Sequence, residues 1–145
     1  CGFSGIYGPS FGDAMGLCLS IAHATNTIEF GTSIQPIYLQ HPVALATTAS
    51  YLHEIAGGRF RLGVGVTHGP VIKQLQVETG KPLSDMRNYV ATMRDAAERM
   101  GGLPDIVLAT LREPSAKRLN AYHRMLYWLS ARTLAFQHSA KYSNA

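Results

Sequence analysis

Short runs of β-forming residues alternate along most of the chain with longer apolar stripes at helical spacing. Runs typical of strands lie at residues 3–7, 28–34, 59–66 and 105–111, with a fifth at 126–129. Helical spacing predicts helices at residues 14–24, 42–56, 86–100 and 114–125. Strands that alternate with helices in this way are typical of βαβ units and a parallel sheet.

Residues with strong local preferences set the expected boundaries. Asp13 is a good N-cap for the helix that follows it, and Pro42 suits the first turn of the next helix, which Gly57-Gly58 should end. The first strand should break at Gly8, and Pro36 should end pairing in the second, leaving residues 36–41 as a loop. Residues 67–82 form a long polar connection.

The strand predicted at residues 59–66 has two very different faces. Because side chains alternate along a strand, one face carries four large apolar residues, Phe60, Leu62, Val64 and Val66. The other face carries Arg61, Gly63 and Gly65. We expect the first face to pack on helices. The second face has almost no side chains.

Either a barrel or a doubly wound sheet satisfies this order of elements. With 145 residues, the chain is shorter than the roughly 250 residues of a complete (β/α)8 barrel, so a barrel would have to be incomplete. In both architectures functional residues collect at the carboxyl ends of the strands. Residues 32–38 and 66–71 are therefore the places to search.

Composition narrows the class of protein. The chain is 46% hydrophobic and 15% charged, as in an ordinary globular domain, and no apolar run is long enough for a membrane span. Cys1 and Cys18 suggest no disulfide framework, and no secretion signal opens the chain, so we expect a cytoplasmic protein without a membrane partner.

The net charge of +4 comes from the C-terminal part of the chain. From Arg112 onward there are six basic residues and one acidic residue, against seven basic and eight acidic residues before it. These cations are dispersed and match no nucleic-acid-binding motif, so a solvated helix face is the favoured interpretation and no nucleic-acid partner is expected. An anionic cofactor or a nucleic acid is the less favoured alternative.

Residues 28–71, IEFGTSIQPIYLQHPVALATTASYLHEIAGGRFRLGVGVTHGPV, resemble the luciferase-like monooxygenase family, especially its branch that uses the deazaflavin coenzyme F-420. The resemblance rests on motifs in the family's order and spacing: Gly31-Thr32-Ser33, His41-Pro42, Gly57-Gly58-Arg59-Phe60 and Leu62-Gly63-Val64-Gly65. It continues more loosely through residues 81–90 and 106–111, and covers about two thirds of the chain.

The resemblance implies an α/β fold of the (β/α)8 TIM-barrel family, with residues 1–145 as a single partial domain that covers roughly strands two to six. Its implied activity is hydride transfer between reduced coenzyme F-420 and a small organic substrate. An FMN-dependent monooxygenase is the first alternative. A non-catalytic, truncated barrel fragment and another phosphate-binding barrel enzyme are the others.

The family binds its cofactor ring at the carboxyl ends of the strands, beside a bulge that commonly contains a non-proline cis peptide bond. Ser33 and Ile34 stand where that bulge would fall. Gly65 could let the ring approach the backbone, while its alternative role, like that of Gly63, is packing inside the barrel.

The loop after residue 66 carries the best candidate residues by this resemblance. Thr67 and His68 would contact the cofactor, and His68 could also donate a proton, because histidine titrates near neutral pH; the alternative is an exposed loop histidine. Ser130 and Arg132 resemble, more weakly, a polar turn that could bind the cofactor's phosphate.

Other polar residues have structural interpretations. His41 should cap the helix at Pro42, and Glu29 and Arg61 should form a buried ion pair at the barrel floor. His23, His53 and His123 have no cysteine or carboxylate cluster at metal-ligand spacing, so no metal site is expected. Open sheet edges in a partial barrel favour a homo-oligomer.

Overall fold

The structure of the protein is a computed structural model, and it describes residues 3–9, 12–67, 69–74 and 76–109. Contacts divide the chain into two compact units, Cys1–Val107 and Leu108–Ala145. The helix predicted at residues 114–125 and the strand predicted at 126–129 lie outside the described residues.

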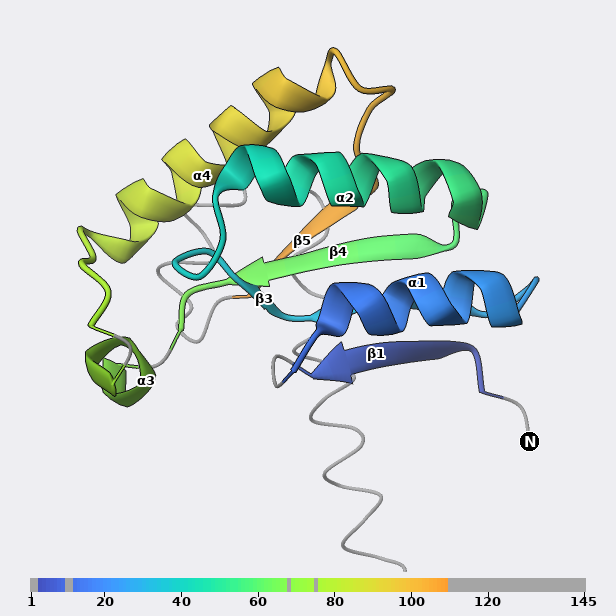
Figure 1. The fold of residues 1–145 in the computed structure, drawn as a ribbon, viewed down its shortest axis with the longest axis horizontal. Helices are drawn as coiled ribbons and strands as arrows, with labels where there is room; N and C mark the ends of the chain where they lie inside the picture. The colour runs from blue at the N-terminus through green and yellow to red at the C-terminus, as the bar shows by residue number, and fades with distance from the viewer. Residues whose placement is uncertain (1–2, 10–11, 68, 75, 110–145) are drawn as a thin grey trace, which may run out of the picture. The chain divides into compact units, whose positions relative to one another are not determined.

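Strands and helices alternate along the described residues, as the sequence predicts (Figure 1). The strands are β1 Gly5–Pro9, β2 Glu29–Ser33, β3 Gln35–Pro36, β4 Phe60–Gly65 and β5 Asp105–Ala109. The helices are α1 Ala14–Ala24, α2 Pro42–Ala56, α3 Gly69–Gln74 and α4 Pro82–Ala97.

The strands form one sheet in which β1 pairs with β2, while β4 pairs with β2, β3 and β5. The pairs of β2 with β1 and of β4 with β2 and β3 are all parallel. In Figure 1 the arrowheads of β1 and β4 point toward the same edge, α2 and α4 lie above β4, and α1 lies between β1 and β4 in this view. The prediction of a parallel sheet with alternating helices is confirmed.

The core lies between the sheet and these helices. Phe30, Phe60, Leu62 and Val64 are fully buried from the strands, and so are Leu45 and Leu52 of α2 and Met93 of α4. The rings of Phe30 and Phe60, which are partners in the β2–β4 register, lie 5.6 Å apart. Burying such side chains contributes roughly 1.5–3 kcal/mol each, which makes this layer the main source of stability.

The helix boundaries follow the predicted signals. The Asp13 carboxylate accepts a hydrogen bond from the Gly16 amide at 2.9 Å and caps α1. His41 caps α2 through Nδ1, which accepts from the Val43 amide at 3.3 Å, so its predicted structural role is confirmed. Gly57 ends α2 in the left-handed conformation, with φ 56° and ψ 41°, which suits glycine at a helix terminus.

The break between β2 and β3 is a β-bulge, because four steps along one strand match three along its neighbour. Gly31 lies opposite Arg61, and Gln35 lies opposite Val64. Within the bulge the Thr32 hydroxyl donates to the Gly63 carbonyl oxygen at 2.7 Å, and this side-chain bond satisfies a backbone acceptor at the interrupted ladder.

Two expected boundaries are wrong. Pro36 does not end pairing: it lies opposite Gly65 in β3, and the next amide, of Ile37, donates to the Gly65 carbonyl oxygen at 3.0 Å. Nor does Gly8 end the first strand, because β1 runs to Pro9. Within the described sheet β1 pairs with β2 on one side and lies at the margin. Proline is tolerated at both positions because each ends a short strand at the sheet margin.

Two further differences concern the helices that follow β4. The long connection at residues 67–82 contains the short helix α3, which is too brief for a periodic pattern to reveal. Helix α4 ends at Ala97, so Met100 does not join its buried stripe and is 39% exposed. The other members of that stripe are buried as predicted: Met86, Tyr89, Val90, Met93 and Ala97.

The predicted ion pair exists, but it is not buried. An Arg61 guanidinium nitrogen lies 3.4 Å from a Glu29 carboxylate oxygen, and the two side chains are 26% and 44% exposed. Arg61 also lies 3.5 Å from a carboxylate oxygen of Asp105 and donates to the Gly58 carbonyl oxygen. Glu29 and Asp105 are the first residues of β2 and β5, so water reaches the pair at the edge where strands begin.

Candidate functional site

The structure brings four of the predicted site residues to the carboxyl ends of adjoining strands. Ser33 ends β2 and Ile34 follows it, while Gly65 ends β4 and Thr67 lies two residues beyond. The register of β3 with β4 keeps these segments side by side, because Pro36 lies opposite Gly65. The other predicted residues, His68, Ser130 and Arg132, lie outside the described residues.

The peptide bond between Ser33 and Ile34 is cis, as the family resemblance implies. It lies inside the bulge that separates β2 from β3. Both side chains are partly exposed, and Ile34 Cγ2 lies 3.6 Å from the position that a side-chain carbon on Gly63 would take. Ile34 therefore lies over the glycine face of β4.

Gly63 of β4 and Gly31 of β2 are required by close approach of the backbone. A Cβ on Gly63 would overlap the backbone carbonyl oxygen of Thr32, and a Cβ on Gly31 would overlap that of Arg61. Such overlap with backbone cannot be relieved by a side-chain movement. Gly63 is thus explained by strand packing, which is the structural alternative considered for it.

Thr67 has the chemical property expected of a ligand-binding residue. Its Oγ1 atom is buried and has no hydrogen-bond partner within the part of the chain that the structure describes. A buried hydroxyl without a partner costs free energy, and most such groups in native proteins are satisfied. The fit of a polar cofactor atom against Thr67 would satisfy this hydroxyl.

A second group of polar residues near the same edge was not singled out by the sequence. Tyr38 donates its hydroxyl to the Asp85 carboxylate at 2.8 Å, and Tyr89 donates to the Gln40 carbonyl oxygen at 2.8 Å. Burial raises the pKa of both tyrosines to about 12, and for Tyr38 the hydrogen bond to Asp85 and its negative charge add to the effect. Only the spacing of Asp85 and Tyr89 by one helical turn was available as a signal.

The profile of the luciferase-like monooxygenase family matches residues 4–125. The chain belongs to this family. The match extends over both segments of the site, from the bulge after β2 to the connection after β4. Members of the luciferase-like family are oxidoreductases, which agrees with the class of activity that the sequence implies.

Among curated proteins, the chain is similar to a 5,10-methylenetetrahydromethanopterin reductase of Archaeoglobus fulgidus, with 31% identity over 78 residues. That alignment covers 54% of this chain and 24% of the reductase. The chain therefore spans about a quarter of the length of this curated relative.

Two solved structures show the same fold at low identity. One is the coenzyme F420 dependent tetrahydromethanopterin reductase from Methanopyrus kandleri, with 15% identity and a TM-score of 0.68 over 81% of this chain and 45% of that one. The other is the oxygenating constituent of 3,6-diketocamphane monooxygenase from Pseudomonas putida in complex with FMN, with 18% identity and a TM-score of 0.66 over 80% and 45%. The sheet is thus part of the luciferase-like TIM-barrel fold, as predicted.

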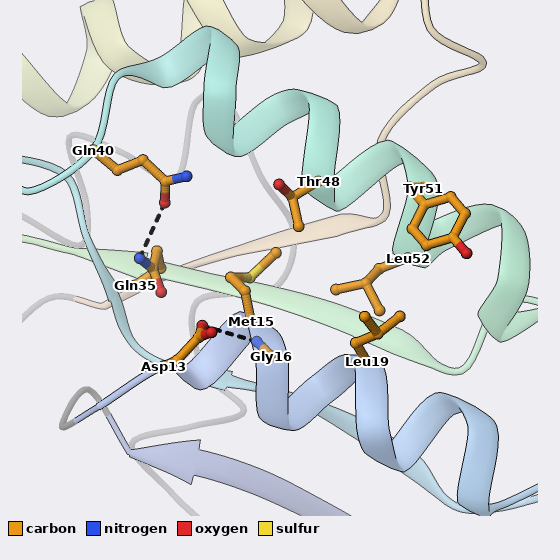
Figure 2. A pocket seen from close by; sticks show the side chains of 9 residues that line it. All are labelled: Asp13, Met15, Gly16, Leu19, Gln35, Gln40, Thr48, Tyr51 and Leu52. Atoms are coloured by element: carbon orange, nitrogen blue, oxygen red, sulfur yellow. Dashed lines mark hydrogen bonds between the residues drawn. The ribbon is translucent and has the colours of Figure 1, made fainter.

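A cavity of about 320 Å³ in the helix layer is separate from these strand-end residues (Figure 2). It lies between α1 and α2, where Met15, Leu19 and Leu52 supply apolar walls. At the other end of the view the side chains of Gln35 and Gln40 are joined by a hydrogen bond of 3.3 Å. Of the predicted cofactor-binding residues that the structure describes, none lines this cavity.

Within the described residues, no group of three histidine, cysteine or carboxylate side chains is placed to hold a metal ion. The helices of the described part are also all too short or too polar to cross a membrane. His23 and His53 both lie in helices, where the sequence placed them.

Proposed function

We propose that this chain supplies part of the cofactor site of a deazaflavin-dependent oxidoreductase, in which hydride passes between reduced coenzyme F-420 and a small organic substrate. The observation that carries the proposal is the buried, unpartnered hydroxyl of Thr67 at the carboxyl end of β4. The strand-end position is where barrel enzymes of this fold collect their functional groups.

Each predicted residue has a role in this proposal. The segment Ser33-Ile34 and the backbone of Gly65 would border the ring, and the Thr67 hydroxyl would bond one of its polar atoms. His68 would hydrogen-bond the cofactor or move a proton at its imidazole, and Ser130 and Arg132 would bind phosphate. The bound cofactor supplies the hydride chemistry, and the protein orients it.

Two of the comparisons bear on the choice of cofactor. The 31% identity to a methylenetetrahydromethanopterin reductase supports the deazaflavin. The diketocamphane monooxygenase in complex with FMN supports the alternative, an FMN-dependent monooxygenase in which reduced flavin activates oxygen. Both cofactors present a planar ring and a phosphate, so the same residues would hold either one.

The test is a titration of the purified chain with coenzyme F-420 and, separately, with FMN, followed by quenching of cofactor fluorescence. Thr67→Val removes the hydroxyl and keeps the shape of the side chain, whereas Thr67→Ser keeps the hydroxyl. Exposed Thr79, in the same connection, provides the control Thr79→Val. Thr67→Val should weaken binding by roughly two- to tenfold, the effect of one hydrogen bond.

The same variant should behave oppositely in the cofactor-free chain. Replacing an unsatisfied buried hydroxyl with a methyl group removes a desolvation cost, so Thr67→Val should leave the free energy of unfolding unchanged or raise it. Tighter binding of FMN than of F-420 would replace the deazaflavin with the flavin in the proposal. Failure of the wild-type chain to bind either cofactor would make it a non-catalytic barrel fragment.

We also propose that the chain self-associates. Large apolar side chains are exposed on and beside the α1 and α2 helices, including Leu17 at 44%, Leu39 at 49% and Val43 at 36%. Contiguous exposed apolar surface often marks an interface. Sedimentation velocity at two protein concentrations would separate a homo-oligomer from a monomer.

A further inference from the structure

Two tyrosine hydroxyls join the loop after β3 to the first turns of α4. From the loop, Tyr38 donates to Asp85 Oδ2 at 2.8 Å, and from the helix, Tyr89 donates to the Gln40 carbonyl oxygen at 2.8 Å. Asp85 and Tyr89 lie four residues apart and so share one face of α4. These four residues, Tyr38, Gln40, Asp85 and Tyr89, are called the tyrosine clasp below.

The Asp85 carboxylate also holds the chain that leads into α4. Its Oδ2 atom accepts from the Gly80 amide at 2.9 Å, in addition to the Tyr38 hydroxyl. A Cβ on Gly80 would come within 2.8 Å of Asp85 Oδ1, so this close approach suits glycine. The side chain of the N-cap residue Lys81 makes no capping hydrogen bond, so the Asp85 carboxylate is the group that holds the chain entering α4.

Burial gives the clasp its strength. Tyr89 is 8% exposed, and with a pKa of about 12 both tyrosines keep the proton that they donate at any physiological pH. The bond from Tyr38 has an ionised acceptor, and charge-assisted hydrogen bonds of this kind are stronger than neutral ones.

The same short loop holds both ends of the β4–α4 connection, residues 66–81. At the start of the connection, the Ile37 amide donates to the Gly65 carbonyl oxygen at 3.0 Å. At its far end, Tyr38 and Gln40 bond α4 through the clasp. Thr67 lies two residues after the first of these anchors, so fixing the far end restricts the positions that Thr67 can take.

We propose that Tyr38 is a positioning residue for the cofactor site, which acts through Asp85 to hold the β4–α4 connection and thereby Thr67. The hydrogen bonds described above support the positioning of the connection. The expected effect of Tyr38 on cofactor binding rests on the proposed function. A full-length chain with Tyr38→Phe loses only the donated hydrogen bond. Tyr51→Phe is the matched control, because Tyr51 is 51% exposed and lies outside the clasp.

The first experiment measures the hold on the connection without any cofactor. Lys73 in α3 is exposed, and Lys81 is followed by Pro82, a bond that trypsin cuts poorly, so the peptide that begins at Gln74 reports on the connection. Tyr38→Phe should speed the appearance of this peptide roughly two- to tenfold relative to Tyr51→Phe. Equal rates in the two variants would overturn the proposal.

A pair of variants at Asp85 separates a specific bond from general damage. Asp85→Asn keeps an oxygen that accepts from the Tyr38 hydroxyl and the Gly80 amide, whereas Asp85→Ala removes it. Cleavage at Lys73 should stay within about threefold of wild type in Asp85→Asn and rise further in Asp85→Ala. A rise of the same size in both would contradict the role of the hydrogen bond.

The second experiment asks whether the clasp acts through Thr67. The Kd for whichever of F-420 and FMN binds is measured for Tyr38→Phe, Thr67→Val and the double variant. Coupled residues give a non-additive result, so Tyr38→Phe should weaken binding in the wild-type background and have a smaller effect when Thr67 is valine. Additive effects, or no effect of Tyr38→Phe, would overturn the positioning of Thr67 while the proposed function stands. Faster cleavage at Lys73 in a chain that binds neither cofactor would overturn the proposed function and support the hold on the connection.

Discussion

The two faces of β4 differ in what determines their residues. On the helix side, Phe60, Leu62 and Val64 are fully buried because large apolar side chains fill the space between β4 and α2. On the other side, Gly63 lacks a side chain because the backbone of β2 occupies that space, and Arg61 extends toward the edge where the strands begin. Side-chain volume therefore decides the first face, and backbone proximity decides the second.

The helix-side face should give the largest effect of substitution. Phe60→Ala leaves a cavity in a closely packed layer and should lower the free energy of unfolding by about 3–5 kcal/mol. Urea denaturation followed by circular dichroism measures it, with Phe3→Ala as the control, since Phe3 is 75% exposed. A loss below about 1.5 kcal/mol would mean that this layer is not the main core.

The glycine face should respond to the opposite kind of change. Gly63→Ala adds one methyl group against the Thr32 carbonyl oxygen and should cost about 1–3 kcal/mol through strain in the strand pair. Gly8→Ala is the control, because the nearest atom to its Cβ would be the tip of the Leu17 side chain, at 3.2 Å, and the nearest backbone atom would be at 3.9 Å. A neutral result at Gly63, in the same denaturation assay, would show that the strands can separate and would remove the contrast between the faces.

The ion pair at the strand-start edge should give the smallest effect. Glu29→Gln is expected to change stability by about 0–1 kcal/mol, because a pair with side chains 26% and 44% exposed is solvated. A buried pair would instead cost about 3–5 kcal/mol when one partner is removed. Denaturation at low and high salt distinguishes a solvated pair from a buried one. Salt screens the attraction in a solvated pair, so only that pair loses its small contribution to stability at high salt.

Periodicity was sufficient to predict the regular part of this fold. The stripe of α4 as far as Ala97, the ends of α2 and the apolar face of β4 as far as Val64 all depend on neighbours close in sequence, and each is where the pattern placed it. The pairing of Pro36 and the presence of α3 were missed, because both depend on contacts between segments that are distant in the chain or too short to show a period.

The candidate site was likewise predicted only in part from the sequence. The positions of Ser33, Ile34 and Thr67 at the strand ends follow from the strand boundaries, but their relation to a cofactor came only from the family resemblance. The bond between Tyr38 and Asp85 joins residues 47 positions apart, and no local signal in the sequence indicates it. The exposure of the Glu29–Arg61 pair could not be predicted from the sequence either, because alternation indicates which face a side chain lies on and not how deeply it is buried.

The β-bulge has a consequence for how this stretch of chain can change in length. Phe30 and Gln35 both lie on the helix side, because their partners Phe60 and Val64 do, although an odd number of positions separates them. Deleting one residue between them would remove the bulge: four positions would then match four, and Gln35 would still lie opposite Val64 on the helix side. The extra residue is therefore not needed for the inside–outside pattern of the chain that follows. What depends on it is the irregular backbone at the strand ends, where Ser33 and Ile34 lie.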